Sequence, residues 1–299
     1  MKKRLAVFVM VAAIASLAIG QKTGPGPKVF ISVDMEGIWG IVHGDQVSPA
    51  SPEYGSARRW MVDDVNAVIA GLFEAGASEI VVNDSHGSMR NIIADGLNPK
   101  ASLVTGTPKP LSMMQGIDGT FDACIFVGYH AKAGTAPANL DHTISGGAMR
   151  SIKINGQELP ELGINGAIAG YFKVPVIMLS GDKETCAQAR SILGNEIVTV
   201  AVKEAAGRYA AKLLPQEEAR KRLKEGAQEA LLKKAKILPF KLNPPYQFEL
   251  DFNNSGQAEL PSLIPVVKRT GARSVTFSSS DYMDGVKLMR ALIALASAQ

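Results

Sequence analysis

The chain has 299 residues, of which 46% are hydrophobic, so it can bury a large core, and this composition excludes intrinsic disorder for most of it. The net charge of +4 falls to near +1 (4 − 3) without Lys2, Lys3 and Arg4, and because no basic stripe is evident elsewhere, nucleic-acid binding is not expected. The two cysteines, Cys124 and Cys186, make no disulfide framework.

The first 20 residues have the three-part pattern of a secretory signal. Three basic residues precede the apolar run LAVFVMVAAIASLAI, and a small-residue site at 18–20 leads into a flexible leader at 21–27. The apolar run is short for a helix that spans a membrane. We therefore expect an exported protein, periplasmic or extracellular, with no stable membrane embedding after cleavage of the signal. An N-terminal anchor is the alternative if the signal stays uncleaved.

Short apolar runs alternate with helical patterns between residues 28 and 202. We expect strands at 28–33, 78–83, 101–105, 121–128, 174–182 and 197–202, and helical segments at 53–75, 88–96, 111–117, 161–172 and 183–192. A hairpin with Asn155-Gly156 at its turn interrupts this order. The alternation predicts an α/β fold with a three-layer, mostly parallel sheet and helices on both faces.

The composition changes after residue 202. A charged helix at 217–236 and a Pro-rich connector are followed by strands at 246–252 and 273–277 and a last helix at 281–297. We expect a smaller α+β subdomain at 203–299, after an α/β metal-binding catalytic domain at 28–202.

Polar motifs follow three of the predicted strands. VDMEG supplies Asp34 and Glu36, NDSH supplies His86, and GYH supplies His130. Because the carboxyl ends of parallel strands converge on one crevice, these side chains can meet there. Carboxylates and neutral imidazoles suit zinc and similar divalent ions, and two carboxylates with two histidines can hold two ions.

Each motif also has a structural interpretation. Asp34 and Glu36 could be solvated acids in a capped turn, and a single histidine is more often structural than a ligand. His142 lies in a polar loop, where it is either an ordinary loop histidine or a general acid or base. Glu161 is either a favourable acid in a helix's first turn or a further oxygen ligand. The residues alone leave these alternatives open.

The chain resembles the D-aminopeptidase (DppA-type) family of zinc metallopeptidases over roughly residues 28–295. The motifs that carry the resemblance are SVDMEGIWG, EAGASEIVVNDSHGSMRN, FVGYHAKAGT, ELGINGAIAGYF and SGQAEL. The resemblance implies two Zn²⁺ per subunit, with Mn²⁺ or Co²⁺ as alternatives, and a ring-shaped homo-oligomer. The metal ligands it implies are Asp34 as the bridging carboxylate, Glu36, His86, His130 and Glu161. The catalytic residue it implies is His142, either as a general acid or base or as a nucleophile, and the sequence does not decide between these roles.

The function that this resemblance implies is an exported aminopeptidase that hydrolyses short peptides with an N-terminal D-amino acid such as D-alanine. One alternative is a dinuclear metal amidohydrolase with a different peptide or amide specificity. The other is a non-catalytic binding module of the cell envelope.

Overall fold

The computed structural model describes residues 25–298. The predicted signal at 1–20 and the first part of the predicted leader lie outside these residues. Within residues 25–298, no helix combines the length and apolar character needed to cross a membrane.

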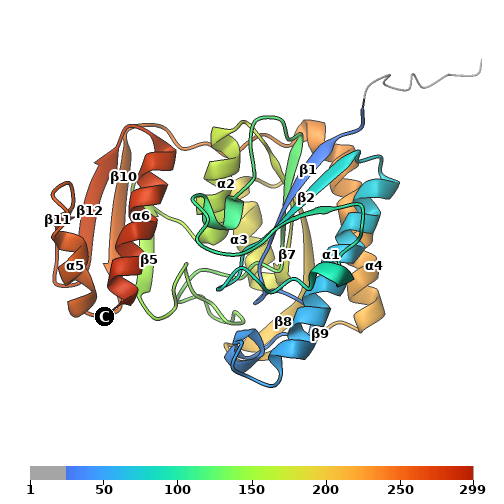
Figure 1. Cartoon of the computed structure of the whole chain (residues 1–299), viewed down its shortest axis with the longest axis horizontal. Coiled ribbons are helices and arrows are strands. Elements are labelled where there is room, and N and C mark those ends of the chain that lie inside the picture. The colour runs from blue at the N-terminus through green and yellow to red at the C-terminus, as the bar shows by residue number, and fades with distance from the viewer. Residues whose placement is uncertain (1–24, 299) are drawn as a thin grey trace, which may run out of the picture.

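The larger part of the molecule is built on a seven-stranded sheet that is parallel except for one edge strand (Figure 1). In sheet order the strands are β3 (Ser102–Val104), β2 (Glu79–Asp84), β1 (Lys28–Val33), β4 (Ala123–Val127), β7 (Val176–Asp182), β8 (Val198–Gly207) and the antiparallel β9 (Ala210–Leu213). The predicted mostly parallel α/β sheet is confirmed.

Helices cover both faces of this sheet. Successive side chains of the central strands point to opposite faces, so both faces carry apolar side chains that helices bury. On one face, α1 (Tyr54–Glu74) and α4 (Gln216–Lys233) pack in one hydrophobic cluster with Val29 and Ile31. On the other face, α2 (Glu161–Tyr171) and α3 (Lys183–Leu193) pack with Phe30. The three layers that the sequence predicts are therefore present.

A second, antiparallel sheet lies beside the α2 and α3 side of the first (Figure 1). Its strands are, in order, β11 (Lys268–Arg269), β12 (Ser274–Ser279), β10 (Tyr246–Phe252), β5 (Met149–Ile154) and β6 (Gln157–Glu158). The short helix α5 (Glu259–Ser262) and the last helix α6 (Tyr282–Ser297) belong to the same part. Phe248 of this sheet and Met289 of α6 share one hydrophobic cluster with Phe30 of β1, so the core is continuous between the two parts.

The two sheets do not follow the division of the chain at residue 203. β5 and β6 precede that residue and pair with β10, whereas β9 and α4 follow it and pack with the first sheet. The hairpin with Asn155-Gly156 at its turn is confirmed, with Asn155 and Gly156 both in the left-handed region. Separate domains at 28–202 and 203–299 stay a prediction.

Two predicted helical segments are wrong in extent. The segment at 88–96 contains only a 3₁₀ turn at Ala94–Gly96, because the Asp84 carboxylate takes the backbone N–H groups of Asn91 and Ile92. The segment at 111–117 is reduced to a 3₁₀ turn at Ser112–Met114, where the positive φ of Ser112 is incompatible with a continuous right-handed helix.

Candidate metal centre

Three adjacent strands deliver four of the candidate ligands to one edge of the first sheet. In the order β2-β1-β4, each strand ends one to three residues before its candidate ligands, and the Asp34 N–H donates to the Val127 carbonyl at 2.8 Å. The Ser85 N–H donates to the Val33 carbonyl at 2.8 Å in the same way. These bonds extend the strand pairing past the strand ends, and they place the motifs side by side as predicted.

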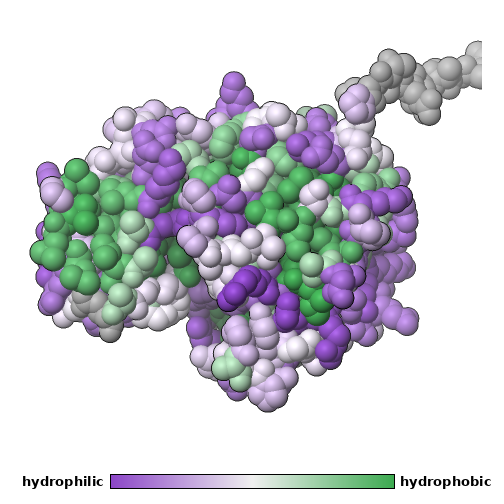
Figure 2. Space-filling model, in the orientation of Figure 1, coloured by the Kyte–Doolittle hydropathy of each residue, from purple (hydrophilic) through white to green (hydrophobic). Residues whose placement is uncertain are grey.

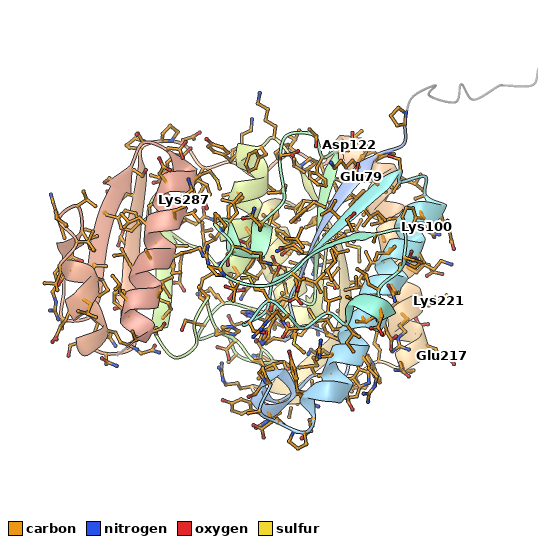
Figure 3. All side chains as sticks on the ribbon, in the orientation of Figure 1. Glu79, Lys100, Asp122, Glu217, Lys221 and Lys287 are labelled. Carbon is orange, nitrogen blue, oxygen red and sulfur yellow. The ribbon has the colours of Figure 1, made fainter. Side chains whose placement is uncertain are left out.

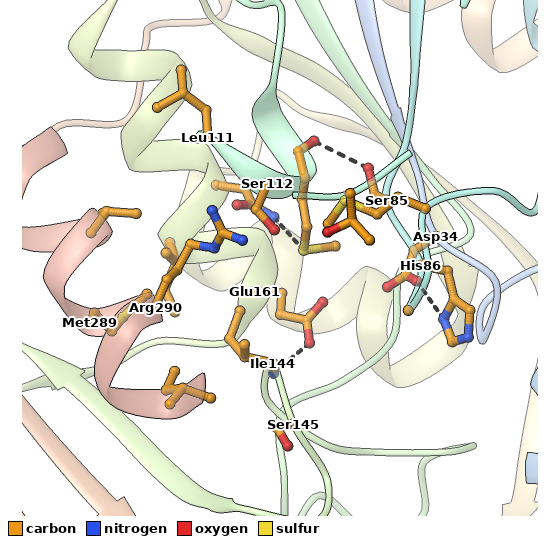
Figure 4. Close-up of a pocket in the computed structure, with 18 of the residues that line it drawn as sticks. Asp34, Ser85, His86, Leu111, Ser112, Ile144, Ser145, Glu161, Met289 and Arg290 are labelled. Carbon is orange, nitrogen blue, oxygen red and sulfur yellow. Dashed lines mark hydrogen bonds and ion pairs between the residues drawn. The ribbon is translucent and has the colours of Figure 1, made fainter. Parts of the chain in front are cut away.

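One group of potential ligands consists of Asp34, Glu36 and His86. The His86 Nδ1 atom lies 3.0 Å from Glu36 Oε2 and 3.3 Å from Asp34 Oδ1. Both carboxylates are buried, so neither is the solvated acid of a surface turn. Figure 4 shows Asp34 and His86 facing each other at the side of a cavity.

A second group consists of His130, His142 and Glu161. His130 Nε2 lies 3.3 Å from Glu161 Oε1 and 3.4 Å from Asp34 Oδ2, and His142 Nε2 lies 3.8 Å from Glu161 Oε1. Glu161 opens α2 but is buried, and it accepts the Ile144 N–H at 2.6 Å. Asp34 thus presents one oxygen to each group, as a bridging carboxylate would.

Backbone carbonyls fix the orientation and tautomer of all three histidines. The bonds are His86 Nε2 to Val47 O at 3.1 Å, His130 Nδ1 to Ala131 O at 3.0 Å, and His142 Nδ1 to Leu140 O at 2.9 Å. A carbonyl only accepts, so each of these nitrogens carries a proton, and in the neutral imidazole the other nitrogen has a free lone pair. This second contact is typical of histidine that binds a metal.

The buried Nε2 atom of His130 shows that the cluster fits a cation. It has no hydrogen-bond partner among residues 25–298, although buried polar atoms are normally paired. Its lone pair points at Asp34 and Glu161, with which it could share a divalent ion. The oxygen and imidazole donors of both groups suit zinc, manganese or cobalt.

The charges of the cluster shift one another's pKa. Burial, together with the negative charge of Glu36, raises the pKa of Asp34. Burial alone would lower the pKa of His86 and of His130, but the neighbouring carboxylates raise both well above the ordinary value. Burial would raise the pKa of Glu36, yet His86 holds it well below the ordinary value. The buried carboxylates therefore require positive charge, which protonated imidazole or a metal ion can supply.

Asp84 stabilises the loop that carries His86. Its carboxylate accepts the N–H groups of Asn91 at 2.5 Å and Ile92 at 2.7 Å, and the Asn91 side-chain amide at 2.8 Å. The same Asn91 amide donates to the His86 backbone carbonyl at 2.6 Å. Asp84 thus positions His86 through the backbone of the loop.

Lys203 is a supporting residue that the sequence did not indicate. It lies on β8, and its buried Nζ donates to the backbone carbonyls of Glu36, Ile38 and Ile41. Burial lowers the pKa of Lys203 to about 7. The strand pattern around it gives no local sign that this lysine turns inward to hold the loop after β1.

A cavity of about 310 Å³ opens beside the two groups. Asp34, His86, His142 and Glu161 line it, together with further residues of α2 and residues of α6. His43 lies elsewhere, where it caps a 3₁₀ turn through the Asp45 N–H. An α/β fold with a buried carboxylate–imidazole cluster at the carboxyl edge of its sheet, open to a small cavity, defines the class of metal-dependent hydrolases.

Comparisons with known proteins assign the chain to one family within that class. The profile of the D-aminopeptidase family matches residues 28–291. A D-aminopeptidase of Bacillus subtilis (strain 168) is 38% identical over 272 residues, which cover 90% of this chain and 97% of the relative. The solved structure of the Zn-dependent D-aminopeptidase DppA from Bacillus subtilis, described as a self-compartmentalizing protease, superposes with a TM-score of 0.88 at 36% identity and covers 91% of this chain and 98% of that one. The chain belongs to the D-aminopeptidase family, and it is a peptidase.

Proposed function

We propose that this chain is an exported aminopeptidase that uses two zinc ions to hydrolyse short peptides with an N-terminal D-residue of the D-alanine type. The observation that carries the proposal is the position of Asp34, whose two oxygens face two separate groups of potential ligands. The zinc dependence of the Bacillus subtilis structure supports the choice of metal.

The protein's side chains would hold the metal ions and transfer protons. Bound divalent ions provide Lewis acidity and lower the pKa of water near them. His142 lies at the cavity with its Nε2 lone pair directed inward, 4.0 Å from Glu36 and 3.8 Å from Glu161. It can accept a proton from the attacking water and deliver it to the departing amine. The Leu140 carbonyl holds the tautomer that this role requires.

The assembly that we propose is a ring-shaped homo-oligomer. The Bacillus subtilis relative is described as self-compartmentalizing, which supports association of subunits around enclosed sites. Exposed apolar side chains at Leu260, Leu263 and Val266 lie on and after α5, and Figure 2 shows a hydrophobic area at this end of the molecule. An exposed apolar patch of this kind is typical of a subunit contact. Light scattering of the purified protein would measure the oligomer size.

A chirality panel tests the proposed activity. Zinc-loaded protein should release D-alanine from D-Ala-D-Ala and from D-alanyl anilide, with little cleavage of the L-isomers, and chelation should abolish the activity until zinc is restored. Equal cleavage of the L-isomers would assign a different amide specificity to the same centre. Failure to hydrolyse any peptide after zinc loading would favour a binding module. Cell fractionation with and without residues 1–20 tests export.

A further inference from the structure

The cavity beside the metal centre has a second polar end, formed by α6. Asp34 and Glu161 line one part of it, and Arg290 of α6 reaches into it from another element (Figure 4). Its volume of about 310 Å³ is at the lower end of the range for small-molecule sites. The site therefore admits a small ligand that contacts the metal centre and α6 together.

The guanidinium of Arg290 is held in place but keeps free donors. Its Nη1 donates to the backbone carbonyls of Lys109 at 2.7 Å and Pro110 at 2.9 Å. Its Nε and Nη2 form no hydrogen bond with any residue from 25 to 298, and it makes no ion pair with a carboxylate in that range. Burial lowers the pKa of Arg290, which reflects a cation without a local counter-charge.

The lining of the cavity that Arg290 and the metal centre share is mainly apolar. It includes Ile144, Ile164, Ile168 and Ile293. A guanidinium without a carboxylate partner in such surroundings favours an anionic ligand group, because the two carbonyls that it contacts leave its charge without a counter-ion. A planar guanidinium with adjacent free N–H groups matches a carboxylate in geometry as well as charge.

A dipeptide carries both groups that such a cavity would bind, a scissile amide for the metal centre and a carboxylate for Arg290. Its scissile amide belongs at the metal centre, and its free carboxylate is only one residue further along the chain. The proposal rests on the function proposed above. We propose that Arg290 binds the C-terminal α-carboxylate of the substrate, so that the enzyme selects dipeptides with a free carboxyl end.

The test compares three substrates with the same N-terminal residue. They are D-Ala-D-Ala, its C-terminal amide, and D-Ala-D-Glu α-amide, which offers a side-chain carboxylate in place of the α-carboxylate. For the wild-type enzyme we expect kcat/KM for D-Ala-D-Ala to exceed that for its amide by about 10- to 100-fold, the effect of a charged hydrogen-bonded pair. Equal values for the acid and the amide would overturn the inference. A kcat/KM for D-Ala-D-Glu α-amide equal to that for D-Ala-D-Ala would contradict the assignment of Arg290 to the α-carboxylate.

Variants of α6 assign the effect to one side chain. Arg290→Met should lose the preference for D-Ala-D-Ala, mainly through a higher KM, and keep the activity on the amide. Arg290→Lys, which retains charge but not the planar fork, should give an intermediate preference. The control is Lys287→Met, because Lys287 is an exposed cation on the same helix (Figure 3) and its loss should change neither substrate. An equal loss on acid and amide in Arg290→Met would show a structural role and contradict the inference.

A binding measurement separates this inference from the proposed function. In metal-depleted protein, D-Ala-D-Ala should raise the melting temperature more than its amide does, and Arg290→Met should remove the difference. This result would support the carboxylate site even if the wild-type enzyme hydrolysed none of the peptides. Equal stabilisation by the acid and the amide would contradict it.

Discussion

The imidazole rings of His130 and His142 stack face to face, with their centroids 3.8 Å apart and their planes 13° from parallel. Both Nε2 atoms approach the same oxygen of Glu161, at 3.3 Å for His130 and 3.8 Å for His142. His130 is buried, whereas His142 lies at the cavity and is partly exposed. The stacked pair therefore combines a candidate ligand with a candidate proton carrier.

Replacing His142 separates these two roles. If His142 transfers protons, His142→Ala should lower kcat by about 10²- to 10⁴-fold and leave the zinc content unchanged. Steady-state kinetics and elemental analysis on the same preparation measure both quantities. His43→Ala is the matched control, because His43 is outside the cavity. Loss of one ion together with activity would instead make His142 a ligand.

Replacing Asp84 tests the support of the His86 loop. Asp84→Ala leaves the buried N–H groups of Asn91 and Ile92 without their acceptor, so we expect a loss in free energy of unfolding on the order of 3 kcal/mol. Urea denaturation measures this value. The exposed Asp95 lies on the same connection, and Asp95→Ala should change stability by less than about 0.5 kcal/mol. Similar values for the two variants would show that the Asp84 bonds do not stabilise the loop.

Asp64 should make stability depend on pH. Its Oδ2 accepts the Trp39 N–H at 2.9 Å, its Oδ1 is buried without a partner among the described residues, and burial raises its pKa to about 7. The unfolded chain releases this proton near pH 4, so the folded state binds more protons between about pH 4 and pH 7. The contribution of Asp64 to stability is therefore complete below about pH 4 and is lost as the pH rises through about 7.

The variant Asp64→Asn should remove this dependence. Urea denaturation at pH 5 and pH 8 should show that the wild-type protein loses stability relative to Asp64→Asn on going to the higher pH. Asp63→Asn serves as the control, because Asp63 is exposed beside Arg220. A constant difference between wild-type protein and Asp64→Asn at the two pH values would show that Asp64 is ionised throughout.

The sequence predicted the parts of the fold that depend on local pattern. The central strands are continuous apolar runs because helices cover both of their faces, and α1 shows apolar residues at helical spacing. β9 was not predicted, because AAKL is a short edge strand with little pattern. The pairing of β5 with β10 joins segments about 100 residues apart, and no local signal specifies such a contact.

The candidate site was predictable where motifs follow strands and less so elsewhere. Asp34, His86 and His130 follow strand ends, and the order of a parallel sheet is sufficient to bring them together. Glu161 and His142 needed the family resemblance, because a first-turn acid and a loop histidine are common without any role in a site. No sequence pattern indicated Lys203 or Arg290 as site residues, because a single cation in an amphipathic segment usually faces water.

The zinc content of the purified chain tests the central claim most directly. After loading and removal of free metal, elemental analysis should give about two ions per wild-type chain, about one in His86→Ala, and almost none in Asp34→Ala, because Asp34 faces both groups. Wild-type protein without zinc after loading, or Asp34→Ala with the full wild-type content, would contradict a two-ion centre built around Asp34.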